Sequence, residues 1–249
     1  MRFGNVLRED TFGNEHFDYL LAHPPFGLSW RNAEERVRAE YERGYEGRFG
    51  AGLPRVSDGS LLFLQHMLAK MKPADASGDG GSRVVVLFSG SPMQGGATGS
   101  GESDIRRWII ENDWLEGIVA LPDQLFYTTG ISTYLWVLSN RKKPAHQGRV
   151  ALVKAQDHWQ KTRQSSGSKR KYLGPDQLDK IVRLYEEALS APIGGSPPAT
   201  RWASCGTRTC FTGRLSSNAR CGCASNSPPT PWTGSPPCGR SSKGYTPRS

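Results

Sequence analysis

The stretch Phe17-Asp18-Tyr19-Leu20-Leu21-Ala22-His23-Pro24-Pro25-Phe26-Gly27 decides how the rest of the chain is interpreted. Its first half is an apolar run with aromatic residues, which is typical of a buried strand. The two prolines that follow cannot donate to a sheet ladder, so we expect the strand to end in a rigid loop near residue 23. In open α/β sheets, ligands bind beyond the carboxyl ends of the strands. This loop is therefore the first candidate for a binding site.

The composition of the loop indicates what it can bind. Each proline fixes its own φ near about −65° and lacks an N–H, so Pro24 and Pro25 present carbonyl acceptors on a stiff frame. The ring of Phe26 follows directly. Acceptors beside an aromatic ring suit a planar ring that carries an amino group, because stacking of a base on such a ring contributes roughly 1 to 3 kcal/mol.

Further along the chain, apolar runs alternate with amphipathic segments, which predicts an α/β fold. The 249 residues suffice for one domain with a sizeable core. We expect further strands at residues 83–88, 114–120, 132–139 and 149–154 and helices at 31–43, 60–71, 103–112 and 176–189. Helix caps are expected at Ser57 or Asp58 and at Ser103. The buried face of the last helix is predicted to consist of Leu178, Ile181, Val182, Leu184 and Tyr185.

The last 59 residues differ from the rest in composition. Residues 191–249 hold seven Lys or Arg, no Asp or Glu and all five cysteines, so the net charge of +9 arises mostly there. The cysteine spacings do not match a zinc site, and we expect no metal. Without hydrophobic periodicity, residues 190–249 are predicted to be a disordered or out-of-frame tail. No apolar run reaches the length of a membrane span or a secretory signal, so a cytoplasmic location is expected.

The loop and its surroundings resemble the modification subunit of type I restriction systems, a family of N6-adenine DNA methyltransferases. His-Pro-Pro-Phe stands where that family has Asn or Asp followed by Pro-Pro-Tyr or Pro-Pro-Phe. Further family-like stretches are Gly4-Asn5-Val6-Leu7, residues 50–64, Gly101-Glu-Ser-Asp-Ile-Arg-Arg-Trp108, Ile118-Val-Ala-Leu-Pro122 and Leu125-Phe-Tyr-Thr-Thr-Gly130.

The resemblance implies a partial Rossmann-like methyltransferase sheet over residues 1–189, the C-terminal part of the domain, in an N-terminally truncated subunit. Its implied methyl donor is S-adenosylmethionine, with Asn5 as a cofactor contact; a turn asparagine is the alternative. The implied catalytic residues are His23, Pro24, Pro25 and Phe26, acting on an adenine flipped out of DNA. The implied partners are DNA, a specificity subunit and a restriction subunit. The family's last strand returns antiparallel.

His23 is the main departure from the family pattern. Neutral imidazole offers one acceptor nitrogen and imidazolium none, whereas the adenine amino group calls for two acceptors. A loop histidine without chemistry is therefore the alternative, and with it a catalytically inactive remnant of the subunit. A basic nucleic-acid-binding protein is the second alternative. A protein glutamine methyltransferase is disfavoured, because its motif usually ends in tyrosine.

Three other groups carry open alternatives. Phe126 and Tyr127 either help to hold a flipped base or pack a hairpin. The basic residues 161, 163 and 169–171 form either a phosphate-binding patch or a solvated face, and the same choice applies to Arg106 and Arg107.

Overall fold

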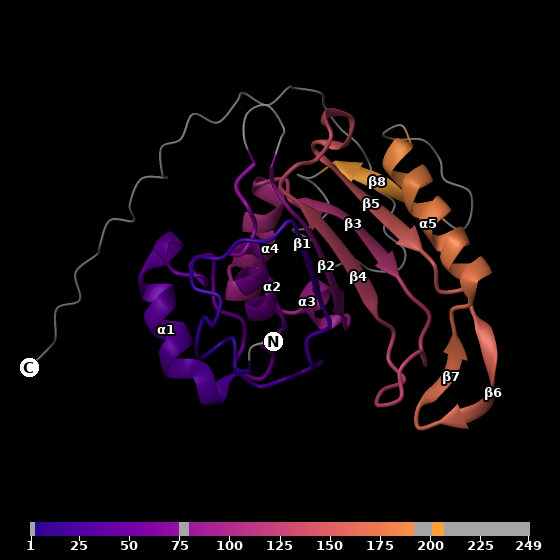
Figure 1. The fold of residues 1–249 in the computed structure, drawn as a ribbon, viewed down its shortest axis with the longest axis horizontal. Helices are drawn as coiled ribbons and strands as arrows, with labels where there is room; N and C mark the ends of the chain where they lie inside the picture. The colour runs from indigo at the N-terminus through magenta and orange to yellow at the C-terminus, as the bar shows by residue number, and fades with distance from the viewer. Residues whose placement is uncertain (1–2, 75–79, 192–200, 207–249) are drawn as a thin grey trace, which may run out of the picture.

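The computed structural model describes residues 3–74 and 80–191 and the backbone of residues 201–206. Its centre is a six-stranded mixed sheet in the order β1-β2-β4-β3-β5-β8, and a two-stranded hairpin, β6-β7, stands apart from it (Figure 1). The strands are β1 (Tyr19–Ala22), β2 (Arg83–Phe88), β3 (Leu115–Ala120), β4 (Tyr134–Ser139), β5 (Arg149–Lys154), β6 (Gln160–Ser166), β7 (Lys169–Tyr172) and β8 (Arg201–Gly206). The helices are α1 (Glu34–Glu42), α2 (Ser60–Leu68), α3 (Ser91–Gln94), α4 (Gly101–Glu111) and α5 (Pro175–Ser190).

Helices cover both faces of the sheet, and strand alternation decides which side chains meet them. Val84, Val86 and Phe88 of β2 are fully buried in one cluster with residues of α2 and α4. On the opposite face, α5 covers β3 and β5 and buries residues such as Val119 and Val153 (Figure 1). The expected α/β fold is confirmed.

A third cluster joins the N-terminal segment to the outside of α2. It consists of the buried residues Leu7, Trp30, Ala33, Val37, Phe49 and Leu62. Together with the short 3-10 helix Arg31–Ala33, α1 confirms the helix expected at residues 31–43. The described part of the N-terminal ten residues forms turns and contains no strand.

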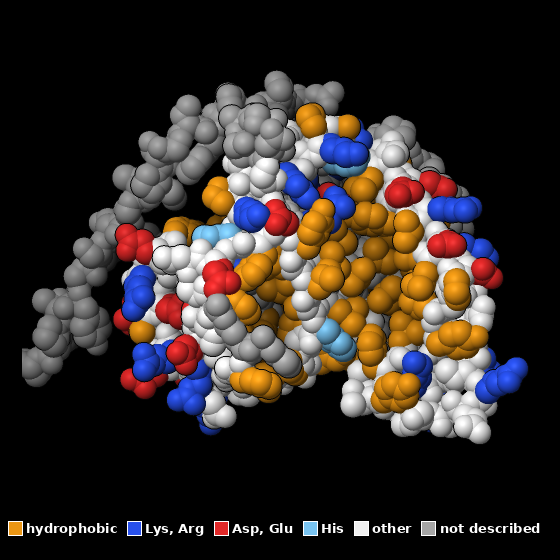
Figure 2. All heavy atoms as spheres, viewed as in Figure 1, with side chains coloured by type: hydrophobic (Ala, Val, Ile, Leu, Met, Phe, Trp, Pro, Cys, Tyr) orange, Lys and Arg blue, Asp and Glu red, His pale blue; other side chains and the backbone are white. Residues whose placement is uncertain are grey.

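The expectation of a buried strand at residues 17–22 is correct in position and wrong in burial. β1 pairs in parallel with β2 and lies at the edge of the sheet. Tyr19 and Leu21 are 69% and 79% exposed, because α5 packs mainly against β3, β5 and β8, toward the other edge of the sheet. Hydrophobic side chains are accordingly visible over the middle of this sheet face (Figure 2).

β4 runs antiparallel between β2 and β3, as the resemblance implied, and β3 pairs in parallel with β5. The helix cap expected at Ser103 is wrong by three residues, since the Ser100 hydroxyl caps α4 by accepting from the Ser103 N–H. Two of the five residues expected to be buried on α5, Leu178 and Val182, are about half exposed.

Of the expected tail, the structure describes residues 190 and 191, at the end of α5, and the backbone of residues 201–206. β8 lies antiparallel to β5 and forms the other edge of the sheet. Residues 192–200 and 207–249 lie outside the described part of the chain, and with them four of the five cysteines, so the expectation of a disordered or out-of-frame tail stays a prediction.

Candidate functional site

The His-Pro-Pro-Phe loop is held at both of its ends. β1 fixes its start by pairing with β2, and the segment that follows Gly27 is bonded to the loop before α2. There the Leu28 carbonyl accepts from the Gly59 N–H at 2.8 Å, and the indole of buried Trp30 donates to the Arg55 carbonyl at 2.9 Å. A loop anchored on both sides keeps its backbone in place without a ligand, which lowers the entropy cost of binding.

Three rings from two loops meet at this point. The His23 ring centroid lies 5.0 Å from that of Phe26 and 5.2 Å from that of Phe126, and the two phenylalanine centroids are 6.3 Å apart. Phe126 comes from the connection between β3 and β4, about a hundred residues away in sequence. Pro24 is buried beneath the cluster, whereas His23 and Pro25 are exposed. The structure thus brings His23, Pro24, Pro25 and Phe26 to one surface and adds Phe126.

The position of Phe126 follows from the topology of the sheet. β1 and β2 are parallel and β4 is antiparallel to β2, so the end of β1 and the start of β4 lie at the same margin. The sequence signal for Phe126 was present in the stretch 125–130, where contact with a flipped base and packing of a hairpin were the two alternatives. The ring contacts with His23 and Phe26 now favour the site.

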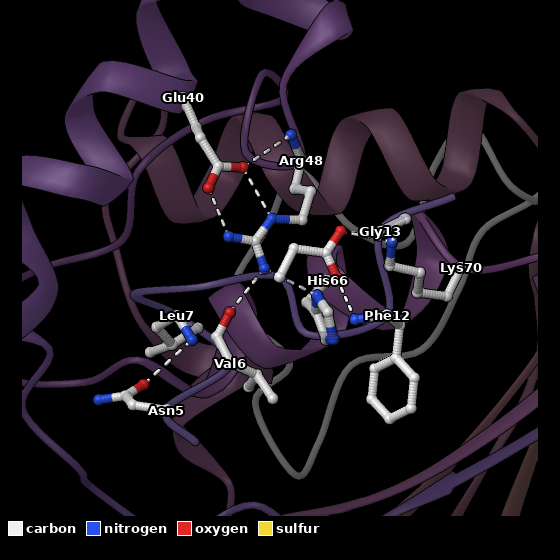
Figure 3. A network of polar contacts seen from close by, with 10 residues as sticks. Asn5, Val6, Leu7, Phe12, Gly13, Glu40, Arg48, His66 and Lys70 are labelled. Carbon is white, nitrogen blue, oxygen red and sulfur yellow. Dashed lines mark hydrogen bonds and ion pairs between the residues drawn. The ribbon is translucent and has the colours of Figure 1, made fainter. Parts of the chain in front are cut away.

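Asn5 lies in a different environment from the three rings. Its side-chain oxygen accepts from the Leu7 N–H at 3.0 Å, which is the turn asparagine that the sequence allowed (Figure 3). It also lines an open hollow of about 430 Å³ together with Arg8, Glu9 and Arg36. The carboxamide therefore both shapes the turn and faces a space that a ligand can enter.

A buried polar network fixes the segment that carries Asn5. The Arg48 guanidinium pairs with Glu40 and donates to the Val6 carbonyl and to Nδ1 of His66 (Figure 3). Burial, with the positive charge of Arg48, lowers the pKa of His66 to about 4. His66 is therefore neutral, and its Nδ1 is the acceptor that Arg48 requires. Lys70, which donates to Asp10 and to the Gly13 carbonyl, ties down the rest of the segment.

A second polar group lies before α2 and after β2. Asp58 accepts from the hydroxyls of Ser60 and Ser91, and these bonds lower its pKa although burial opposes ionisation. Arg55 also donates to Ser91 at 2.7 Å. Asp58 thus acts as a structural acceptor at the start of α2, but the N-cap is Gly59, so the cap predicted at Ser57 or Asp58 is wrong.

The family-like stretches at 50–64 and 101–108 pack against each other. The Arg55 N–H donates to Glu102 at 2.9 Å, and a Cβ added to Gly101 would lie 1.8 Å from the Leu53 carbonyl. Glycine is required there by this close approach. The Arg55 carbonyl, which accepts from the Trp30 indole, links these stretches to the segment after the His-Pro-Pro-Phe loop. Arg106 is buried and donates to the Pro92 carbonyl, so it is not a phosphate contact.

Among residues 3–74 and 80–191, no group of three or more His, Cys, Asp or Glu is arranged to hold a metal ion. Nor does any helix in the described part of the chain have the length and apolar character needed to cross a membrane.

Comparisons with known proteins place this geometry in context. Residues 1–202 match the family model described as N-6 DNA Methylase. The chain is 26% identical over 189 residues to the type I restriction enzyme MjaIX methylase subunit of Methanocaldococcus jannaschii, with 75% of this chain and 31% of that protein aligned. It is 28% identical over 143 residues to the HindI methylase subunit of Haemophilus influenzae, with 57% and 28% aligned. The chain therefore spans about a third of the length of these relatives.

Solved structures share the fold. The type I restriction-modification methyltransferase subunit from Streptococcus thermophilus superposes with a TM-score of 0.57 at 20% identity, covering 73% of this chain and 34% of that one. A modification subunit of a putative type I restriction enzyme from Vibrio vulnificus gives 0.55 at 17% identity, covering 82% and 37%.

Proposed function

Because the chain belongs to the N-6 DNA methylase family, we propose that it carries the base-binding loop of an adenine-N6 DNA methyltransferase subunit from a type I restriction system. The observation that carries this proposal is the cluster of His23, Phe26 and Phe126 beside the Pro-Pro frame at the carboxyl end of β1. The relatives named above are methylase subunits of such systems.

The chemistry explains why this arrangement suits adenine. The exocyclic nitrogen of adenine is a poor nucleophile, since its lone pair is delocalised into the ring. Acceptors placed at its two hydrogens draw them out of the ring plane and make the lone pair available, which is electrostatic preorganisation at the reacting atom. The carbonyl of Pro24 is one proposed acceptor, and the side chain of His23 is the other. Phe26 and Phe126 would stack on the extruded base and offset part of the cost of flipping.

His23 also limits this site. In the structure the imidazole contacts both phenylalanine rings, so a base that stacks on either of them takes the place of His23. We therefore propose that the imidazole turns from the two phenylalanine rings toward the amino group when the base enters, so that its ring nitrogen accepts there; its exposed position permits this movement.

The family implies a methyl donor, and we propose S-adenosylmethionine, which supplies an electrophilic methyl group when bound. Asn5 is the proposed contact of this chain with it. The Asn5 side-chain oxygen accepts from the Leu7 N–H, and its amide N–H groups are the hydrogen-bond donors that it offers to the hollow. They fit a ring nitrogen of the adenine in S-adenosylmethionine, which is an acceptor. The proposed partners are DNA, a specificity subunit and a restriction subunit, and the proposed location is the cytoplasm.

The proposal is tested by measuring the affinity of the chain for two short duplexes. One contains a paired adenine, and the other the same adenine opposite an abasic site. Unpairing costs a few kcal/mol, so we expect tighter binding of the unpaired adenine by about 10-fold or more. Phe26→Ala and Phe126→Ala should each reduce this ratio, because each removes a stacking surface worth roughly 1 to 3 kcal/mol.

Tyr41→Ala is the matched control, since Tyr41 is a partly exposed aromatic residue on α1. It should leave the ratio unchanged. Equal affinity of the unaltered chain for the two duplexes would refute the base-binding role. Methyl transfer is measured separately, as N6-methyladenine formed by the chain assembled with its specificity subunit.

A further inference from the structure

The hairpin of β6 and β7 is the most basic segment of the described chain. Residues 158–175 contain five Lys or Arg and no Asp or Glu. Lys161, Arg163 and Arg170 are exposed, whereas Lys169 and Lys171 are partly buried. In Figure 2, Lys and Arg side chains lie over this hairpin, at the end of the hydrophobic sheet face.

The hairpin is fixed to the loop that carries Phe126. The backbone N–H groups of Arg170 and Lys171 donate to the Gln124 carbonyl at 3.0 and 3.2 Å, and the Ser168 N–H donates to the Tyr127 carbonyl at 2.9 Å. Gly167 has φ +55°, and a Cβ there would lie 2.4 Å from the backbone carbonyl oxygen of Tyr127. The close approach of the hairpin turn to the Phe126 loop therefore requires glycine at this position.

Side chains strengthen the same attachment. Lys169 lies 4.8 Å from the centre of the Tyr127 ring, and Lys171 forms an ion pair with Asp123 and a cation–π contact with Trp159. Lys169 and Lys171 thus attach the hairpin to Tyr127 and Asp123, which lie on either side of Phe126 in sequence, and the Phe126 ring contacts His23 and Phe26.

The charge pattern is unfavourable for a purely structural hairpin. Lys161 stands directly opposite Lys171 in the strand register, and like charges in that position destabilise a sheet. Asp123 pairs with Lys171, whereas Lys161 and Arg163, two residues apart in β6, are both exposed. An anion that binds beside Lys161 and Arg163 would relieve the remaining repulsion.

We propose that the β6–β7 hairpin binds the phosphodiester backbone of the duplex beside the flipped adenine. This inference rests on the proposed function, because a nucleotide extruded toward Phe26 and Phe126 remains joined to the duplex by its flanking phosphates. Lys161 and Arg163 are the proposed phosphate contacts, and Lys169 and Lys171 keep the hairpin on the loop.

The test compares two variants of the full chain that lose the same charge. Lys161→Gln/Arg163→Gln removes the proposed contacts, and Lys180→Gln/Arg183→Gln removes two exposed cations from α5. Affinity for a duplex is measured over a range of salt concentrations. The logarithm of affinity falls with the logarithm of salt by about 0.9 per phosphate contact, so we expect the hairpin variant to lose about 1.8 from this slope. At about 0.1 M salt its affinity should fall roughly 10- to 60-fold.

The α5 variant should keep the salt slope of the unaltered chain. Lys161→Arg/Arg163→Lys, which preserves both charges, should keep this slope as well. Equal losses in the hairpin and α5 variants would show an effect of net charge only and overturn the proposal, as would an unchanged slope in the hairpin variant. Thermal unfolding of each variant confirms that it is folded.

The ratio of affinities for unpaired and paired adenine separates this inference from the proposed function. The hairpin variant should bind both duplexes more weakly and keep their ratio. A ratio near one in the unaltered chain contradicts base binding, and the salt slopes of the variants then still decide whether the hairpin binds the DNA backbone.

Discussion

His23 stands at the position where the proposed reaction needs an acceptor, and its geometry is poorly suited to that task. The imidazole supplies one acceptor nitrogen at most and occupies the space against Phe26 and Phe126. An asparagine there would supply a carbonyl acceptor and leave both rings open. Removal of one preorganised partner typically costs about 100- to 1000-fold in rate. We therefore expect His23→Asn to raise formation of N6-methyladenine by a factor of that order in the assembled complex.

Duplex affinity should change little in His23→Asn, because contacts with the DNA backbone are untouched. A lower rate in His23→Asn than in the unaltered chain would show that the histidine is a working acceptor in its own right.

His66 makes the stability of the N-terminal segment depend on pH. Its pKa is about 4 in the folded chain, below the ordinary value of 6.5, because burial and Arg48 disfavour the charged ring; Lys70 acts in the same direction, and Asp10 and Glu40 oppose it. As the pH falls below 6.5, the unfolded chain takes up this proton first. Between pH 6.5 and 5, we expect His66 to lower the free energy of unfolding by about 2 kcal/mol.

The measurement is urea denaturation at both pH values, in the unaltered chain and in His66→Gln. Glutamine can still accept a hydrogen bond from Arg48. The other histidines contribute equally to the pH dependence of stability in both proteins. If the two proteins lose the same stability between these pH values, His66 is not the titrating group.

At the scale of single residues, the sequence pointed to the candidate site residues but not to the residues that support them. His23, Pro24, Pro25 and Phe26 are adjacent in the chain, so one motif identifies them. Arg48 and His66 could not be predicted as partners, because tertiary packing brings them together from segments 18 residues apart and buries His66 and the side chain of Arg48. Nothing in the sequence indicated that Arg48 is buried, since most arginines are exposed.

Among the helices, α4 offers a direct comparison of two serines. Both Ser100 and Ser103 precede or begin an apolar helical pattern, but only the Ser100 hydroxyl accepts from a backbone N–H of the first turn. Ser100→Ala should therefore lower the free energy of unfolding by about 1 kcal/mol. Ser103→Ala, measured by the same denaturation, should change it by less than about 0.5 kcal/mol. A larger loss of stability in Ser103→Ala than in Ser100→Ala would show that Ser103 is the cap, as the sequence predicted.

At the scale of elements, positions were predicted more reliably than burial. β2 and β5 have the expected bounds, because their apolar runs are bordered by polar turns. The exposure of Tyr19, Leu21, Leu178 and Val182 was not predicted, since it depends on how far α5 extends across the sheet. That extent is a property of the assembled layers and has no local pattern.

The whole molecule presents an open strand at one side. Among the strands that the structure describes, β1 has a single neighbour, and its outward side chains are apolar. An edge of this kind favours pairing between chains. We expect the sedimentation coefficient of the chain to rise with concentration and Leu21→Lys to reduce this rise.

Leu178→Lys is the matched control, because Leu178 is an exposed leucine on a helix and not on a strand edge. A similar reduction in both variants would point to general hydrophobic association, and no concentration dependence in the unaltered chain would contradict the prediction.

The strand order has a consequence for the chain while it is being made. β2 can pair with β1 as soon as it is synthesised, but its other neighbour is β4, which ends at Ser139, about 50 residues later. At translation rates of about 5 to 20 residues per second, that partner arrives roughly 3 to 10 s after β2. During this interval Val84-Val85-Val86-Leu87-Phe88 has an unpaired side and no finished core to cover it. We therefore expect a chaperone that binds apolar segments to bind most strongly to a ribosome-bound chain stopped before β4.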